Sequence, residues 1–117
     1  MKNVLIVDDS MLMRRMTRQI LEKNKYTVAG EAENGMNALV KYQELKPDVV
    51  TMDITMPEMS GLEAIKLLKR MDPNAKVVMI SAMGQESMVA EAIVSGAKGF
   101  LVKPYREEDL LKALRSL

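Results

Sequence analysis

The side chains best suited to chemistry in this sequence stand directly after short apolar runs. They are three carboxylates, one hydroxyl and one ammonium, carried by Asp8, Asp9, Asp53, Ser81 and Lys103. The runs before them lack polar alternation, which is typical of strands that are covered on both faces. An acid such as Asp53 at the end of a buried strand is costly unless its charge is compensated or used. The pattern therefore predicts a functional site.

Three carboxylates that lie together need positive charge nearby. Two like charges about 4 Å apart repel by roughly 4 kcal/mol at an effective dielectric constant near 20. Lys103 would offset one negative charge, and a divalent cation would offset two. The chain has no cysteine and no histidine, which leaves only oxygen ligands for a metal and makes Mg²⁺ the best match.

This combination fits the transfer of a phosphoryl group to a carboxylate. Mg²⁺ keeps several waters when it binds a protein, so a phosphate oxygen can replace one of them. Asp53 would be the nucleophile, Lys103 and the metal would contact the transferring oxygens, and the Ser81 hydroxyl would donate to the product. Each residue taken alone could have a purely structural role, for example as an aspartate in a turn or a lysine exposed to solvent. Their coincidence at four strand ends favours the site.

Five strand-like runs alternate with five helix-like segments along the chain. The strand-like runs are residues 4–7, 26–29, 49–52, 76–80 and 99–102. Such alternation predicts an α/β protein, with a parallel sheet between layers of helices. The carboxyl ends of parallel strands share one edge of the sheet, where ligands bind at the point at which the strand order reverses. The polar residues are therefore expected to converge at that edge.

The helix-like segments carry signals for their ends and for their buried faces. Ser60 and Glu63 have the spacing of a capping box, and Gly96 is the expected stop of the fourth helix. The apolar positions predicted to face inward in the first and fourth helices are Met13, Met16, Ile20, Val89, Ala92 and Ile93. The remaining face of the first helix is expected to be solvated and carries Arg14, Arg15 and Arg18.

Length and composition narrow the class of protein. The 117 residues are 48% hydrophobic, which is enough for one core. Because 17 basic residues are balanced by 16 acidic ones, the chain lacks the excess positive charge that is typical of nucleic-acid-binding proteins. No apolar run reaches the ~18 residues of a membrane span, and the N-terminus lacks the pattern of a secretion signal. We therefore expect a cytoplasmic monomer with one domain over residues 1–117 and no output domain.

The order of these motifs resembles the receiver domain of two-component response regulators, and the resemblance covers the whole chain. It is carried by Asp8–Asp9, by Asp53 with the Met-Pro-Glu-Met-Ser-Gly that ends at Gly61, by Ser81–Ala82 and by Lys103–Pro104. Residues 52–59 and 81–85 look most like single-domain chemotaxis regulators of the CheY type. The resemblance implies a three-layer, doubly wound, flavodoxin-like fold with five parallel strands in the order 2-1-3-4-5.

The resemblance also implies roles for the residues at the edge. Asp53 would be the phosphoryl acceptor, and Asp9, Asp53 and the backbone carbonyl of Thr55 would ligate Mg²⁺, with Asp8 acting through water. Lys103 would pair with the phosphoryl group, and the Lys103–Pro104 bond is often cis in the family.

A switch is implied as well. Ser81 would move to bind the phosphoryl oxygen, and Phe100 would turn into the space it leaves, which changes the face built from the fourth helix, fifth strand and fifth helix. Ser81 stands where Thr is commoner, and Phe100 stands where the best-known chemotaxis regulators have Tyr. Phe100 could instead be a static core aromatic. Thr55 and Met83 would shape the access of water for self-dephosphorylation.

The implied partners are a CheA-like sensor histidine kinase and a flagellar motor switch protein or a related phosphatase. A phosphorelay intermediate is the nearest alternative. A Mg²⁺-dependent aspartyl-phosphate phosphatase is a further one, but such enzymes often carry a second acid where this chain has Thr55. A flavodoxin-like redox protein is disfavoured, because aromatic residues make up only 3% of the chain.

Overall fold

The structure is a computed structural model in which residues 2–117 are described. Its centre is one parallel sheet formed by β1 (Asn3–Val7), β2 (Thr27–Ala32), β3 (Val49–Asp53), β4 (Val77–Ser81) and β5 (Gly99–Val102). The strand order is β2-β1-β3-β4-β5, and every neighbouring pair is parallel. This confirms the predicted fold class and strand order.

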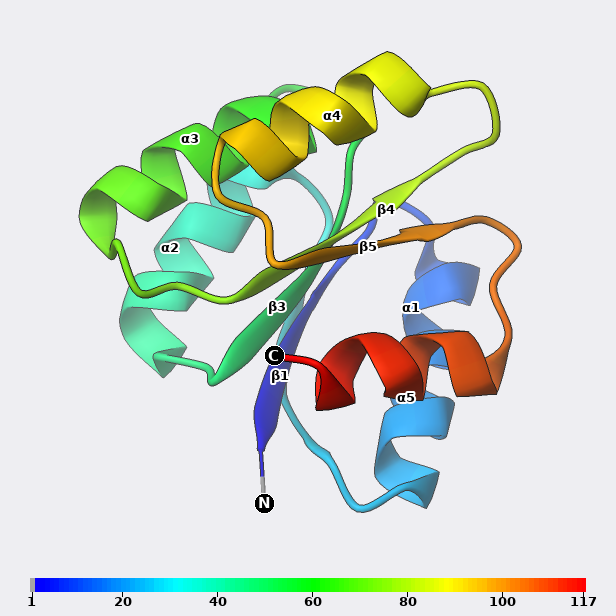
Figure 1. Cartoon of the computed structure of the whole chain (residues 1–117). Coiled ribbons are helices and arrows are strands. Elements are labelled where there is room, and N and C mark those ends of the chain that lie inside the picture. Colours follow the sequence, from blue (N-terminus) through cyan, green and yellow to red (C-terminus); the bar gives the residue numbers. More distant parts are fainter. Residues whose placement is uncertain (1) are drawn as a thin grey trace.

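Five helices follow the strands in turn: α1 (Met11–Lys23), α2 (Gly35–Leu45), α3 (Gly61–Met71), α4 (Glu86–Val94) and α5 (Glu107–Arg115). Helices α1 and α5 cover one face of the sheet, whereas α2, α3 and α4 cover the other (Figure 1). The longest helix, α1, has 13 residues. Within residues 2–117, no helix has both the length and the apolar character needed to cross a bilayer.

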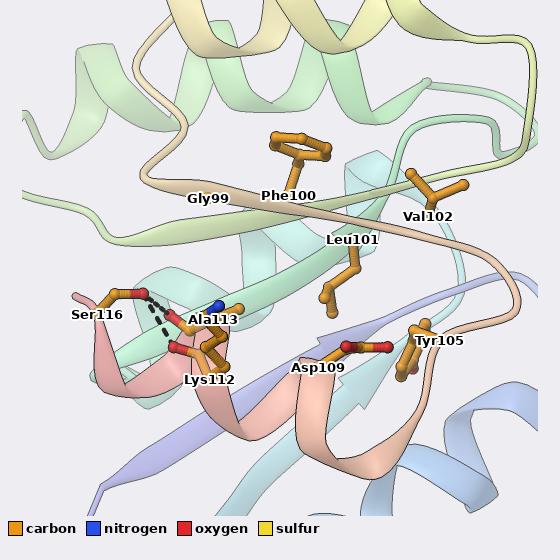
Figure 2. A pocket seen from close by; sticks show the side chains of 9 residues that line it. All are labelled: Gly99, Phe100, Leu101, Val102, Tyr105, Asp109, Lys112, Ala113 and Ser116. Carbon is orange, nitrogen blue, oxygen red and sulfur yellow. Dashed lines mark hydrogen bonds between the residues drawn. The ribbon is translucent and has the colours of Figure 1, made fainter.

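The core is divided by the sheet into two clusters. Leu5 and Val7 pack under α2 and α3, whereas Val4 and Ile6 pack against α1 and α5. Successive side chains of a strand point to opposite faces, so each buried strand supplies both clusters. At β5 the same alternation places Leu101 in the cluster between the sheet and α5 and leaves Phe100 on the opposite side of the strand (Figure 2).

The predicted helix signals are present. The Ser60 side chain accepts a bond from the Glu63 amide, and the Glu63 carboxylate accepts one from the Ser60 amide, which completes the capping box. Gly96 follows α4 with a φ of 112°, a conformation that L side chains rarely adopt. These caps fix where α3 and α4 begin or end relative to the strand ends.

The predicted buried faces of α1 and α4 were partly wrong. Thr17 and Leu21 are the buried residues of α1, whereas Met16 is exposed, and Ile93 of α4 is also exposed. Thr17 is buried because its hydroxyl shares a 2.6 Å hydrogen bond with the Tyr105 hydroxyl. The arginines of α1 are not all solvated either, since the Arg14 side chain is only 13% exposed.

Candidate functional site

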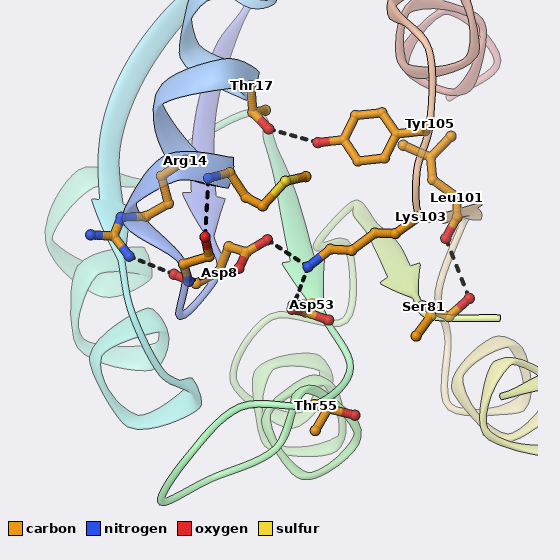
Figure 3. A network of polar contacts seen from close by, with 12 residues as sticks. Asp8, Arg14, Thr17, Asp53, Thr55, Ser81, Leu101, Lys103 and Tyr105 are labelled. Atoms are coloured by element: carbon orange, nitrogen blue, oxygen red, sulfur yellow. Dashed lines mark hydrogen bonds and ion pairs between the residues drawn. The ribbon is translucent and has the colours of Figure 1, made fainter. Parts of the chain in front are cut away.

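The predicted acids and the lysine meet at the carboxyl edge of the sheet. Asp8, Asp9 and Asp53 each offer a carboxylate oxygen, and these oxygens lie within 4.8 Å of one another. The Lys103 ammonium lies 2.9 Å from Asp53 Oδ2 and 3.1 Å from Asp8 Oδ2 (Figure 3). Asp8 and Asp53 are buried, while Asp9 is exposed. The edge therefore combines one open and two enclosed carboxylates around one fixed cation.

Asp8 is held by bonds with β2, with helix α1 and with Ser10, the N-cap residue of α1. Its amide donates to the Ala32 carbonyl of β2, its carboxylate accepts from the Ser10 amide at 2.9 Å, and its carbonyl accepts from Arg14 Nη1 at 2.7 Å. Arg14 is held in turn by a 3.0 Å ion pair with Glu31 of β2. Arg14 was missed in the sequence because a helical arginine usually faces water.

The loop after Asp53 is equally constrained. The Ile54 amide donates to Ile80 of β4 at 2.9 Å, and the Gly61 amide closes the loop onto the Ile54 carbonyl at 2.7 Å. A Cβ on Gly61 would overlap the backbone carbonyl oxygen of Asp53. Glu58 adopts a left-handed φ of 66°, and its carboxylate accepts a bond from Asn34 at the start of α2. The Asp53 carboxylate thus stands on a backbone that is fixed on both sides.

The electrostatics show a site short of positive charge. Burial raises the pKa of Asp53; the hydrogen bond from Lys103 offsets part of this rise, and the charge of Asp8 adds to it. Burial alone would lower the pKa of Lys103, but its bonds with Asp53 and Asp8 raise it. A cation that enters this set of oxygens would stabilise the charged carboxylates. The donor set fits a hard cation such as Mg²⁺.

The other predicted residues surround this centre. Ser81 is buried, and its hydroxyl makes a long 3.4 Å contact with the Leu101 carbonyl. Thr55 is exposed and accepts a bond from Gln85, whereas the Met83 side chain is 79% exposed. Phe100 is 48% exposed, so its ring does not lie in the core of this structure.

The Lys103–Pro104 peptide bond is cis, as the resemblance implied. Two residues later, Tyr105 is tied to α1 through its hydrogen bond with Thr17. This contact anchors the segment that carries Lys103, and burial raises the pKa of the Tyr105 hydroxyl. No spacing in the sequence pointed to this pair, because its members are far apart along the chain.

Comparison with known proteins places the chain in a family. It is 57% identical to chemotaxis protein CheY of Thermotoga maritima over 99% of this chain and 97% of that protein. It is 54% identical to chemotaxis protein CheY of Bacillus subtilis over 95% of this chain and 92% of that protein. A solved CheX–CheY–BeF3–Mg²⁺ complex from Borrelia burgdorferi contains a similar chain, with a TM-score of 0.94, 38% identity, and coverage of 98% of this chain and 87% of that one. The model of the response regulator receiver domain matches residues 4–115, and the chain therefore belongs to the family of response regulator receiver domains.

Proposed function

We propose that this receiver domain is a phosphorylation-activated switch in which Asp53 accepts a phosphoryl group from a histidine kinase. The observation that carries the proposal is the Asp53 carboxylate, buried at the sheet edge, 2.9 Å from the Lys103 ammonium and grouped with Asp8 and Asp9. A carboxylate, a fixed ammonium and a set of oxygen ligands for a cation are the parts that phosphoryl transfer requires.

In the proposed step, a carboxylate oxygen of Asp53 attacks the phosphorus of a phosphohistidine. A P–O bond forms and the P–N bond breaks, so the imidazole of the kinase leaves with the electron pair. Lys103 stabilises the charge on the equatorial oxygens through its ammonium. Asp9, Asp53 and the Thr55 carbonyl, with Asp8 through water, would hold Mg²⁺, which supplies further charge stabilisation. Hydrolysis reverses the modification when water attacks the phosphorus, and Thr55 and Met83 lie where they could shape its access.

The output would be a change of the face formed by α4, β5 and α5. Phe100 and Val102 are exposed on β5 there, and Ile93 is exposed on α4. When Ser81 moves to bind the phosphoryl oxygen, Phe100 would turn inward and alter this face. A CheA-like kinase, and a flagellar motor switch protein or a phosphatase, are the proposed partners. In the Borrelia structure a similar CheY chain forms a complex with a second protein, CheX, which supports a protein partner for this chain.

The same residues would serve a phosphorelay intermediate, which remains the alternative within this class. A phosphatase that turns over external substrates lacks support, because Thr55 stands where its second acid would be. Residues 1–117 would act as one receiver domain, as a monomer in the cytoplasm.

Acetyl phosphate tests the acceptor directly. The protein is incubated with acetyl phosphate and Mg²⁺ and quenched in acid, and its intact mass is measured by mass spectrometry. We expect one phosphoryl adduct, which is lost in Asp53→Asn and after chelation of the metal with EDTA. Asp48→Asn, at an exposed position just before β3, is the matched control and should still be labelled. Full labelling of Asp53→Asn, or no labelling from acetyl phosphate or a phosphorylated kinase, would overturn the proposal.

A further inference from the structure

Gln85 holds an unusual position beside the acceptor site. It occupies the N-cap of α4, but its side chain makes no hydrogen bond to the amides of that helix. Short side chains such as Ser or Asn are preferred at N-caps because they can reach those amides. The Gln85 side chain instead turns back, so that its Oε1 accepts from the Ala82 amide at 2.7 Å and its Nε2 donates to Thr55 Oγ1 at 2.8 Å. It therefore bridges the loops that follow β4 and β3.

The bridge continues the sheet beyond its last strand residues. The Ile80 carbonyl accepts from the Ile54 amide, so this peptide edge of β4 faces β3. Alternate residues of a strand point their amides and carbonyls to the same side, which directs the Ala82 amide toward β3 as well. Beyond Asp53 the chain of β3 has turned into its loop. The side-chain amide of Gln85 takes the place of the next peptide group in the ladder.

The identity of the amide atoms follows from their partners. A backbone N–H can only donate, so the atom that faces Ala82 is the Gln85 oxygen, and the nitrogen faces Thr55. The Ser81 hydroxyl and the Ala82 amide, the two donors at the end of β4, both have a partner in this structure. The Ser81 hydroxyl contacts Leu101, and the Ala82 amide contacts Gln85. The Ser81 contact is long at 3.4 Å, so the Gln85 contact is the better formed of the two.

We propose that Gln85 is a latch that holds the resting conformation, and that phosphoryl oxygens on Asp53 compete with it for the Ala82 amide. This inference rests on the proposed phosphorylation of Asp53. A phosphoryl group brings three strong acceptor oxygens, which can attract a donor that is now paired with a neutral amide. When Ala82 changes partner, Gln85 is released and the start of α4 loses its tie to Thr55.

The attachment of α4 makes such a release consequential. Ala92 is the only fully buried residue of α4, and Val89 is partly buried against the core. A groove of about 470 Å³ lies between this helix and β5, and its lining includes Gln85, Ile93 and Phe100. The latch thus connects the acceptor site to a helix that has few buried residues and lies beside Phe100. The strength of the two Gln85 hydrogen bonds sets how often the unphosphorylated protein adopts the switched conformation.

Binding of beryllofluoride, a phosphoryl mimic, in the presence of Mg²⁺ measures this equilibrium. Removal of the latch in Gln85→Ala should tighten beryllofluoride binding by about three- to tenfold, the range expected for one net hydrogen bond. It should also slow the loss of phosphate from phosphorylated protein. Thr55→Val removes one end of the bridge and should also tighten beryllofluoride binding. In a double-mutant cycle the two changes should be less than additive, because they break the same bridge.

Ser87→Ala is the matched control, since Ser87 is exposed in the first turn of α4 and should leave binding unchanged. Gln85→Asn provides a second variant with an intact amide that is too short to reach both partners, and it should fall between wild type and Gln85→Ala. Urea unfolding checks that the variants are folded. Unchanged or weaker beryllofluoride binding in both Gln85 variants overturns the latch. If the wild type is labelled at Asp53 in that case, the proposed function survives; if it is not, both fail.

Discussion

At the scale of single residues, the proposed acceptor site at Asp53 depends on a position that has no room for a side chain. Gly61 begins α3, and its amide closes the loop onto the carbonyl of Ile54. A Cβ there would overlap the carbonyl oxygen of Asp53 and would lie 3.0 Å from Ile54 Cα. Both neighbours are backbone atoms, so neither can give way by changing a rotamer. The geometry of Asp53 is therefore coupled to the absence of a side chain eight residues later.

Substitution of this glycine should affect both stability and the site. We expect Gly61→Ala to lower the free energy of unfolding by about 1–3 kcal/mol, as is usual for overpacking, and to slow labelling by acetyl phosphate. Gly99→Ala is the control, because a Cβ at Gly99 meets only a Val78 methyl at an ordinary 3.9 Å. Urea unfolding monitored by circular dichroism gives the comparison. Equal unfolding midpoints for the two variants would refute the steric argument.

At the scale of elements, helices α2 and α3 are joined by a polar contact away from the proposed acceptor site. The Tyr42 hydroxyl of α2 donates to Asp72 Oδ2 at the end of α3, with an O–O distance of 2.6 Å. This bond lowers the pKa of Asp72, while burial and the bond with Asp72 raise the pKa of Tyr42. The bond thus requires an ionised aspartate and a protonated tyrosine.

The two pKa shifts define the pH range in which the contact stabilises the fold. The pKa of Asp72 is lower in the folded than in the unfolded state, so its contribution is complete above about pH 4 and is lost as the pH falls through the folded value. The pKa of Tyr42 is higher in the folded state, so its contribution is complete below about pH 10 and is lost above that.

Tyr42→Phe should therefore lower the urea midpoint at neutral pH, and the difference from wild type should shrink in acid below about pH 4. The measurement is a series of unfolding curves from pH 3 to 8. Tyr26→Phe serves as the control, because Tyr26 packs against the core cluster on the opposite face of the sheet from Tyr42 and should give no such pH dependence. A difference between wild type and Tyr42→Phe that is constant over this range would contradict the assignment.

At the scale of the whole molecule, the proposed acceptor Asp53 and the proposed output face are connected through the middle of the sheet. Asp53 pairs in register with Ile80 of β4, and the next β4 residue, Ser81, pairs with Val102 of β5. Phe100 lies two residues before Val102 and is half exposed on the α4 side. A change at Asp53 needs to cross only one strand to reach this face.

The chain has one phenylalanine, which makes this connection measurable. Labelling with fluorophenylalanine should give a single fluorine NMR resonance that reports on Phe100. We expect beryllofluoride with Mg²⁺ to shift this resonance and to reduce its sensitivity to exchange of H2O for D2O, because the ring becomes more buried. The Asp53→Asn variant should show neither change. A wild-type resonance that stays constant at saturating beryllofluoride would remove Phe100 from the switch.

The sequence predicted the sheet, its edge and the meeting of Asp8, Asp9, Asp53 and Lys103, because apolar runs and strand ends are local features. It did not predict contacts that are formed only by tertiary structure. The buried face of α1 was misassigned because Thr17 finds the Tyr105 hydroxyl on another element. Gln85 was overlooked for a related reason, since glutamine at a helix start carries no signal that it will bond backwards across two loops.

The double contact of Lys103 bears on which cation this position can tolerate. An ammonium carries three N–H donors, and two of them face Asp8 and Asp53. Rotation about its last bond can offer the third to a newly arrived oxygen, while the Lys103 amide stays bonded to the Ser81 carbonyl. A guanidinium has the same charge but a planar fork with fixed directions, so it would have to displace one partner or move the chain. Lysine and arginine are therefore not equivalent here, because the position requires an ammonium group that can rotate to a new partner without leaving Asp8 and Asp53.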